Sequence, residues 1–472
     1  MGYAKFIGRI GALAVALGVG AGLAATPWAA SAKPSDADTS ADPSTPKTPP
    51  GQNMSVSTNG VVRVQKGDAI AQSEGQGSVA IARGDGSTAY ALGGDHNKAM
   101  VHGDGSVAIA GADPNDPTVG GSGNRAVVHG DNSFAGAALG DGNTATVRGD
   151  GSQATAALGN GNTATVDGDG THATAAFGDG NTAIVHGGGT ADALQGNGNT
   201  AVVYGSGGAF AADGDGNTAI VHGDSFATAQ GGNGNTASVT GDNSSVSAGG
   251  GNDNTATVTG DNSFAGAIIG DNNTATVAGD DSTASTTFGD NNTVEVAGDG
   301  SRATADFGSS NTVTVNGDGS QATATRSGDG TAAVTGDGSN ADISDGDNNA
   351  AIVSGDGSEA SATGVYGLGG GNNAATVTGD GSVATAFGGD NNTATITGDN
   401  STATANGPRN NTATVTGDAS DATAIGTDNN AEVNGDNSNA IAGPGGNNTA
   451  VVNGDGLTAD TGPGFANTVI VP

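Results

Sequence analysis

Three residue types recur in this sequence in patterns that could support chemistry. Aspartates stand in Gly-Asp-Gly groups, histidines in Val-His-Gly groups, and threonines in Thr-x-Thr pairs. Carboxylate oxygens are the ligands that calcium prefers, imidazole binds transition metals, and threonine presents a hydroxyl beside a methyl group. What each group can do depends on how the chain positions it.

The chain repeats itself with a period of eighteen or nineteen residues, and one asparagine marks each period. The series skips Gly330 and has fainter members at Asn59, Ser78 and Asn97. Such a period indicates stacked structural repeats, here about 22 coils. The marking residues are Asn124, Asn143, Asn162, Asn181, Asn199, Asn217, Asn235, Asn254, Asn273, Asn292, Asn311, Asn349, Asn373, Asn392, Asn411, Asn430, Asn448 and Asn467.

Each period has two halves, and each half predicts a corner followed by a strand. Glycine and aspartate favour turns, and the residues that follow include β-branched types. In the first strand, residues 143, 145 and 147 share one side because side chains alternate. Val147 recurs as valine from coil to coil, whereas the column of Arg148 also holds Asp167 and Tyr204, so the valine side is interior. The sequence therefore predicts an all-β fold, a long, narrow, two-sheet parallel β-solenoid.

The interior is expected to be thin and its corners polar. Ala154 and Ala156 point inward in the second strand, while Gln153 and Thr155 point outward. Asn143 and its equivalents are expected to form an amide ladder, since buried polar groups need partners. A serine column is expected to do the same at the other corner, and large apolar residues to fill a wider end of the interior. The serines are Ser152, Ser301, Ser320, Ser358, Ser382 and Ser401, and the large residues are Leu158, Phe177, Phe288, Phe307 and Phe387.

The N-terminal residues predict export. Residues 1–32 have a basic start, an apolar run and the Ala30-Ser31-Ala32 pattern, which together are typical of a signal peptide cleaved before Lys33. Residues 33–52 are rich in Pro, Ser and Thr and are expected to be a disordered linker. Residues 53–472 are the predicted solenoid domain. No second apolar stretch is present, so the mature protein is not expected to be an integral membrane protein.

The charge and the absence of cysteine restrict the partners. Loss of the two cations of the leader changes the formal charge from 13 − 48 = −35 to 11 − 48 = −37. A strongly negative protein repels nucleic acid and anionic membranes, so neither is expected as a partner. The chain has no cysteine, so no disulfides stabilise the exported protein.

Catalysis is not expected. The histidines fall on repeat positions rather than beside an acid–base partner, and four of them end a first strand on its solvent side, where a solvated column explains them better than a metal site. Solenoid enzymes need long loops around a cleft, but only two short insertions occur, at residues 111–118 and 364–370. The six histidines are His96, His102, His129, His172, His186 and His222.

Calcium is the inorganic ligand that fits best. The half-repeat resembles the calcium-binding nonapeptide β-roll in its opening glycine and its apolar eighth residue, as in Gly140 and Val147. The family's ligand aspartate belongs at the sixth position, where this sequence has Ala145, so that role is not carried over. Acids instead occupy the second position, where turn formation and solubility are the alternative explanation. The candidate metal residues are Asp141, Asp150, Asp169, Asp280, Asp290 and Asp299.

The outward threonines form a regular array of hydroxyl and methyl groups. The array resembles the ice-binding face of insect-type and bacterial antifreeze solenoids, which implies ice binding as an alternative function. Ile184, Val202, Ile220, Glu295 and Ala374 interrupt it. The binding-face candidates are Thr144, Thr146, Thr163, Thr165, Thr255, Thr257, Thr274, Thr276, Thr312, Thr314, Thr393, Thr395, Thr412 and Thr414.

Two further resemblances concern the bacterial surface. Residues 77–95 and 103–111 resemble the head repeats of trimeric autotransporter adhesins, although the stalk and membrane anchor of that family are missing. The leader resembles those of mycobacterial exported Gly/Ala-rich proteins, which bears on compartment more than on activity.

The leading hypothesis is an exported, non-catalytic repeat protein, secreted or on the cell surface. It would be a structural component of the envelope or an adhesin for glycan or matrix, acting through many weak identical sites. A variable column of the second strand adds contact candidates, and the apolar segment 467–472 predicts end-to-end association. The variable column comprises Gln153, His172, Phe226, Arg302, Gln321 and Glu359.

Overall fold

The structure, a computed structural model, describes residues 53–364 and 370–472. The predicted signal peptide and linker lie outside the described residues, as does most of the second insertion. The described part contains strands and no helix, and it divides after Gly205 into two units. Counted over both units, the strands form about 21 turns of a β-solenoid.

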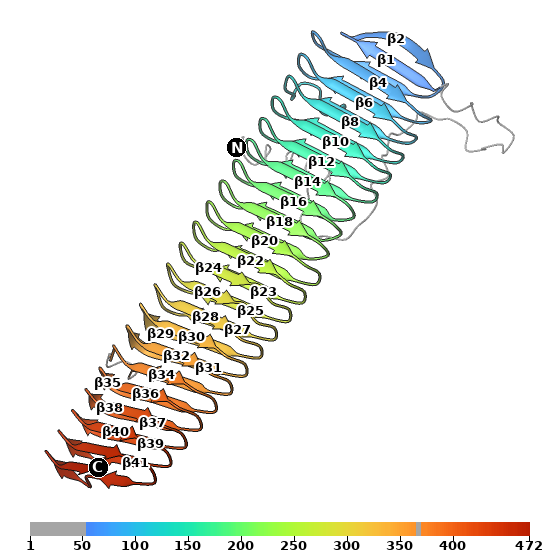
Figure 1. Cartoon of the computed structure of the whole chain (residues 1–472). Coiled ribbons are helices and arrows are strands. Elements are labelled where there is room, and N and C mark those ends of the chain that lie inside the picture. Colours follow the sequence, from blue (N-terminus) through green and yellow to red (C-terminus); the bar gives the residue numbers. More distant parts are fainter. Residues whose placement is uncertain (1–52, 365–369) are drawn as a thin grey trace, which may run out of the picture. The chain divides into compact units, whose positions relative to one another are not determined.

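In the first unit, alternate strands join two different sheets, because the glycine corner after each strand turns the chain from one sheet to the other (Figure 1). The first sheet of this unit contains β1 (Met54–Thr58), β2 (Val61–Lys66), β4 (Val79–Arg83), β6 (Lys98–His102), β8 (Arg125–His129), β10 (Thr144–Arg148), β12 (Thr163–Asp167), β14 (Thr182–His186) and β16 (Thr200–Tyr204). Its second sheet contains β3 (Ile70–Ser73), β5 (Thr88–Leu92), β7 (Val107–Gly111), β9 (Phe134–Ala138), β11 (Gln153–Ala157), β13 (His172–Ala176) and β15 (Thr190–Leu194).

The second unit has the same two-sheet arrangement. Its first sheet contains β18 (Thr218–His222), β20 (Thr236–Thr240), β22 (Thr255–Thr259), β24 (Thr274–Val277), β26 (Thr293–Val296), β28 (Thr312–Asn316), β30 (Thr331–Thr335), β32 (Ala350–Ser354), β34 (Ala374–Thr378), β36 (Thr393–Thr397), β38 (Thr412–Thr416), β40 (Asn430–Asn434), β43 (Thr449–Asn453) and β46 (Thr468–Val471). Its second sheet begins with β17 (Gly208–Ala212), β19 (Phe226–Gln230), β21 (Ser245–Gly249), β23 (Phe264–Ile268), β25 (Thr283–Thr287), β27 (Arg302–Asp306), β29 (Gln321–Gly328) and β31 (Asn340–Asp347). It continues with β33 (Glu359–Thr363), β35 (Val383–Asp390), β37 (Thr402–Arg409), β39 (Asp421–Thr427), β41 (Asn439–Ala442), β42 (Gly445–Gly446), β44 (Thr458–Asp460) and β45 (Gly464–Phe465).

Neighbouring coils pair in parallel with equivalent residues opposite each other. Val147 lies opposite Val166 in the first unit, and Val258 lies opposite Val277 in the second. The predicted fold class and register are confirmed, and each outward residue type becomes a column along its unit.

The core is as thin as the sequence predicts. Ala145, Val147, Ala154 and Ala156 have no exposed surface. One coil therefore buries only small groups, at about 0.8 kcal/mol per methylene, and depends on its neighbours for stability.

The corner glycines allow the coils to approach each other closely. A Cβ on Gly149 would lie 2.0 Å from the carbonyl oxygen of Gly168 in the next coil, and the φ of Gly149 is 141°. Gly151 has a φ of 63° with open space around it, and Asn132 adopts the same conformation one coil earlier. The first glycine of this corner is thus required for packing, and the second for turn conformation.

The first predicted coil is an exception to the parallel arrangement. β1 pairs antiparallel with both β2 and β4, so this end of the first sheet is a hairpin. Asn59 lies exposed in the turn of that hairpin, and its assignment to the asparagine column was wrong. Asn59-Gly60 stands between β1 and β2 in place of a Gly-Asp corner, and both residues have a positive φ, as the tight turn of a hairpin requires.

The predicted wide end of the interior is also wrong. Phe288, Phe307 and Phe387 are 47%, 58% and 45% exposed, and Leu158 and Phe177 are only half-buried. Four of these five residues have a φ between 53° and 60°, so the strand ends before them and they turn out of the core. Phe288 and Phe307 stack on each other outside it, with ring centroids 4.9 Å apart.

The missing asparagine at Gly330 has a packing explanation. A Cβ there would lie 2.3 Å from Cδ1 of Ile343, which is fully buried at a position where other coils have alanine. The larger isoleucine occupies the space that the asparagine side chain would need.

Candidate functional site

The threonine columns lie on the outer side of the first sheet. Thr144 and Thr146 are half-buried and pair with Thr163 and Thr165 in the next coil. All of the other candidate threonines are likewise half-buried, except Thr312, which is exposed. The structure therefore places every candidate threonine in the predicted outward column.

The array is continuous only over short stretches. In the second unit, Thr255 and Thr257 pair with Thr274 and Thr276, but Thr276 then faces Glu295. The pairs at β36 and β38 also align, until Thr414 faces Glu432. A flat ligand that lay across β20, β22 and β24 would meet the carboxylate of Glu295 on the next strand, β26.

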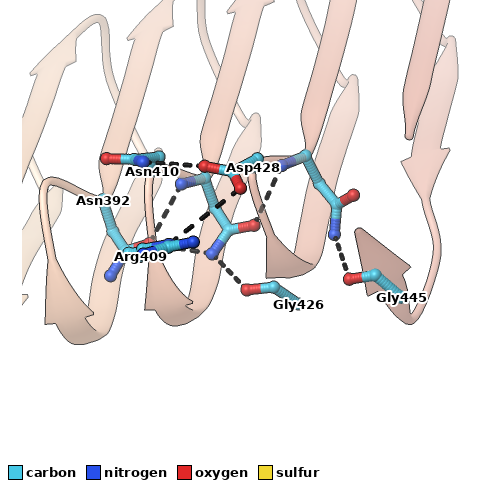
Figure 2. Close-up of polar contacts among 8 residues, drawn as sticks. Asn392, Arg409, Asn410, Gly426, Asp428 and Gly445 are labelled. Atoms are coloured by element: carbon cyan, nitrogen blue, oxygen red, sulfur yellow. Dashed lines mark hydrogen bonds and ion pairs between the residues drawn. The ribbon is translucent and has the colours of Figure 1, made fainter. Parts of the chain in front are cut away.

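The asparagine column is structural, as predicted, but its hydrogen bonds differ from a simple amide ladder. The assignment of Asn430 to it was wrong, because Asn429 accepts the N–H of Asn448 and Asn430 lies opposite the outward Thr412. The backbone N–H of Asn162 donates to Oδ1 of Asn143, at 2.9 Å, and Nδ2 of Asn143 donates to the carbonyl of Gly159, at 2.8 Å. Direct amide–amide bonds occur in places, such as Asn411 Nδ2 to Asn392 Oδ1 at 2.9 Å (Figure 2). Each side chain thus joins its corner to the backbone of the coil before or after it.

Polar groups continue outward from this corner. In Figure 2, Arg409 and Asn410 both point toward Asp428 of the next coil, and Nδ2 of Asn410 donates to its carboxylate at 2.7 Å. The serine column at the other corner works similarly, because Ser152 donates to the carbonyl of Gly168 and its Oγ accepts the N–H of Thr171. Both columns stabilise the stack and present no buried ligand site.

The corner aspartates also bind backbone. The N–H of Asp150 donates to Oδ1 of Asp169, and the N–H of Asp280 donates to Oδ1 of Asp299. These carboxylates are exposed and stacked in columns. Among the described residues, no group of three or more acidic, histidine or cysteine side chains is arranged to hold a metal ion. The remaining metal candidates are Asp141 and Asp290. The N–H of Asp141 donates to Oδ1 of Asn160, and the carboxylate of Asp290 accepts the N–H of Asp271.

The second sheet carries the variable column on its outer side. Gln153, Arg302, Gln321 and Glu359 are exposed, and Phe226 is 63% exposed. His172 is the half-buried exception. Thr155 lies on the outward side of its strand but is fully buried, so the alternation of side chains alone does not predict its exposure.

His172 lies in a polar cluster with Thr174 and Asp192. Its Nε2 is 2.6 Å from the hydroxyl of Thr174 and 4.0 Å from Oδ1 of Asp192. Burial lowers the pKa of His172, an effect that Asp192 partly opposes, and burial raises the pKa of Asp192. Because both partners contact the same nitrogen, the imidazole does not connect a carboxylate to a hydroxyl as a catalytic relay requires.

The histidines that end the first strands form an exposed outward column, as predicted. His102 and His129 lie with ring centroids 6.2 Å apart, and His186 stacks on Tyr204 at 5.2 Å. Burial lowers the pKa of His129, and the charges of His102, Arg148 and Arg125 lower it further. His129 thus belongs to a local concentration of positive charge.

That concentration is the feature that sequence reasoning missed. Four of the 13 lysines and arginines lie in residues 1–52, which leaves nine in the described part. Six of these nine lie on the first sheet of the first unit, within β2–β10, namely Arg63, Lys66, Arg83, Lys98, Arg125 and Arg148. The signal was present in the sequence, but the overall charge of −35 concealed it.

Comparison with known proteins gives no further guide. No protein-family model matches this chain, and no curated protein is significantly similar to it. Within the described residues, no helix is long and apolar enough to span a membrane.

Proposed function

We propose that this chain is an exported, non-catalytic repeat protein that serves as a structural component of the cell envelope or as a multivalent surface adhesin. The observation that supports it is the in-register repetition of outward residues over buried columns. Equivalent residues face each other from coil to coil, so a weak contact made by one coil is repeated by the next. Many weak contacts raise apparent affinity without any single strong site.

Cell fractionation and surface binding test this proposal. The protein should be found in the envelope fraction or the medium, and it should be retained on a glycan or matrix array. Retention should fall steeply for variants in which several coils lose their outward threonines, because avidity depends on the number of contacts. Cytoplasmic localisation, or retention on no surface at all, would refute the proposal.

Ice binding is the second candidate, and the aligned threonine pairs favour it. Their hydroxyls lie about 6.6 Å apart along a strand and about 4.8 Å apart between coils, a regular lattice. The charges of Glu295 and Glu432 in the same columns oppose it. Purified protein that neither shapes ice crystals nor shows thermal hysteresis would exclude this candidate.

Self-association through the C-terminal coil is part of the proposal. Among the described strands, β46 pairs only with β43, and Ile470 and Phe465 are 60% and 78% exposed. Unpaired strand edges favour pairing with another chain. Sedimentation at micromolar concentration should show oligomers that Ile470→Lys dissociates. A monomer that the substitution leaves unchanged would contradict this part.

A further inference from the structure

The outward side of β2, β1, β4, β6, β8 and β10 carries an apolar stripe between positive charges. Its central column is Val64, Val56, Ile81, Met100 and Val127, which lie opposite one another in register. Polar threonine takes over this column at Thr146. We call this surface the basic face, and the strands named here define it.

Cations flank the stripe on both sides. One flank holds Lys66, Arg83, His102, His129 and Arg148, with Met54 opposite both Lys66 and Arg83. The other flank holds Lys98 and Arg125, which are paired in register. The two flanks are four residues apart along each strand, or about 13 Å.

These cations form no ion pair within the described part of the chain, and Asp167 of β12, which lies opposite Arg148, marks the end of the basic face. Arg83, Lys98, Arg125 and Arg148 are exposed, and none of them forms an ion pair with a described residue. In contrast, Arg326 pairs with Asp345 at 2.7 Å, and Arg409 lies 4.0 Å from Asp428. Unpaired like charges this close repel one another, so an external anion would stabilise them.

The stripe is recessed rather than protruding. Ile81 and Met100 are half-buried and, with Arg83, His102 and His129, line a shallow hollow, while Val127 at the end of the stripe is buried. Recessed side chains cannot insert into a bilayer, but they can contact the C–H face of a sugar ring. A lipid surface therefore fits this face less well than a linear molecule lying along it.

The borders of the face limit the width of its ligand. Exposed aspartates follow the cationic flank at each corner, for example Asp104, Asp131 and Asp150, and Asp95 and Asp141 lie at the opposite corner. A broad polyanion such as duplex DNA would meet these carboxylates, whereas a single polymer strand lies between them. The face extends over five strand steps, or about 24 Å.

We propose that the basic face binds a linear anionic polysaccharide, one that carries a carboxylate or sulfate on its sugar residues. This inference rests on the proposed function, because it names the glycan class and the coils that an adhesin of this kind would use. On one flank Lys98 and Arg125 lie about 4.8 Å apart, and on the other Lys66, Arg83 and Arg148 lie about 10 and 14 Å apart, so acidic groups spaced along the polymer can each reach a cation. Sugar rings lie over the apolar stripe.

Substitutions already present in the repeat supply the test. Thr144 lies opposite Arg125, and Thr240 stands at the repeat position equivalent to that of Arg148, so Arg125→Thr with Arg148→Thr keeps a residue type that the fold accepts. Arg326→Asn with Arg409→Thr is the control with the same change in charge, because asparagine accepts the left-handed conformation of Arg326, whose φ is 50°. Binding of the purified protein to polygalacturonate would be measured by titration calorimetry at low and high salt.

The first pair should weaken binding about tenfold at low salt and much less at high salt, and the control pair should have little effect. Met100→Thr should weaken binding without changing its salt dependence. Binding should strengthen as pH falls below about 6.5, because His129 gains charge beside Arg125 and Arg148. Equal losses from both pairs, or no binding of polygalacturonate, would overturn the inference.

Other ligands separate this inference from the proposed function. Equal or stronger binding of duplex DNA or of vesicles containing anionic lipid would overturn the polysaccharide assignment. Binding of neutral glycans that the basic-face variants leave unchanged would also overturn it, while the proposed adhesin function would stand. Binding of polygalacturonate by a protein confined to the cytoplasm would support the site and refute the proposed function.

Discussion

The basic face of the first unit and the outward side of β20, β22 and β24 in the second are built on the same frame. Both cover buried alanine and valine columns, and both end in asparagine corners bonded to the neighbouring backbone. Their outward residues differ, since the basic face has cations, histidines and aliphatic side chains before threonines appear at β10, and the other, the threonine face, has only threonine and serine. The comparison shows that inward and corner residues determine the fold, so the outward columns can vary without changing it.

The largest effect should come from placing an aspartate at a buried position rather than at the exposed position beside it. Val147→Asp and Val258→Asp should each destabilise their coils by about 3–5 kcal/mol, because an unpaired charge is buried. Arg148→Asp and Thr259→Asp should change stability by less than about 1 kcal/mol, since both sites are exposed and water screens the repulsion from Asp167 opposite residue 148. Hydrogen exchange of the affected coils measures this, as repeat arrays do not unfold in two states. Similar costs for both residues of a pair would invalidate the assignment of faces.

The corners should respond alike in the two regions. Asn143→Ala and Asn254→Ala each leave a backbone N–H and a glycine carbonyl without their partner, which should cost about 1–3 kcal/mol. Thr144→Ala and Thr255→Ala, one residue later, are the controls. Hydrogen exchange of the same coils is again the measurement. A large difference between the two asparagine variants would mean that the regions do not share a frame.

Acid should distinguish the regions. The folded-state pKa of His129 is lowered, so as pH falls below about 6.5 the unfolded chain takes up the proton first and the folded basic face loses stability. The threonine face has no histidine. Hydrogen exchange, corrected for its intrinsic pH dependence, should therefore show modest loosening around β8 at pH 5.5 that His129→Thr removes. Equal loosening in β22, or none in β8, would contradict this expectation.

Cations in solution should have the smallest effect and the same effect on both regions. Neighbouring exposed aspartates about 4.8 Å apart repel by at most roughly 0.9 kcal/mol in water, and salt screens this repulsion. Sodium chloride should raise the melting temperature slightly, and calcium chloride at equal ionic strength should do no more. A further rise with calcium that chelator reverses would instead support the calcium-binding alternative.

The repeat made most of this fold predictable. Val147 and Arg148 could be assigned to opposite faces because their columns accept different residue types, and the period itself gave the register. The antiparallel β1 was missed because Asn59 fell on the repeat period, although Asn59-Gly60 is a typical hairpin turn. The outward turn of Phe288 depends on a backbone conformation that glycine usually adopts, so hydrophobicity alone pointed to the wrong side.

The candidate site was predictable only in part. The threonine columns follow from alternation, and the structure places them as expected. The basic face includes β1, which runs antiparallel to both of its neighbours, β2 and β4. Val64, Val56 and Ile81 can therefore be placed in one column only when the hairpin is known. The average charge of the chain also conceals any local excess of the opposite sign.

The bonds of each asparagine corner run to the backbone of the adjacent coils, and equivalent groups recur in those coils. A gene made of nearly identical coding units is prone to unequal recombination, which removes or duplicates whole units. The new neighbours at such a junction would find the same N–H and carbonyl partners that the old ones had. Strains of the source organism are therefore expected to carry alleles of different length. The number of residues in each outward column would change between alleles, while the two-sheet fold would stay the same.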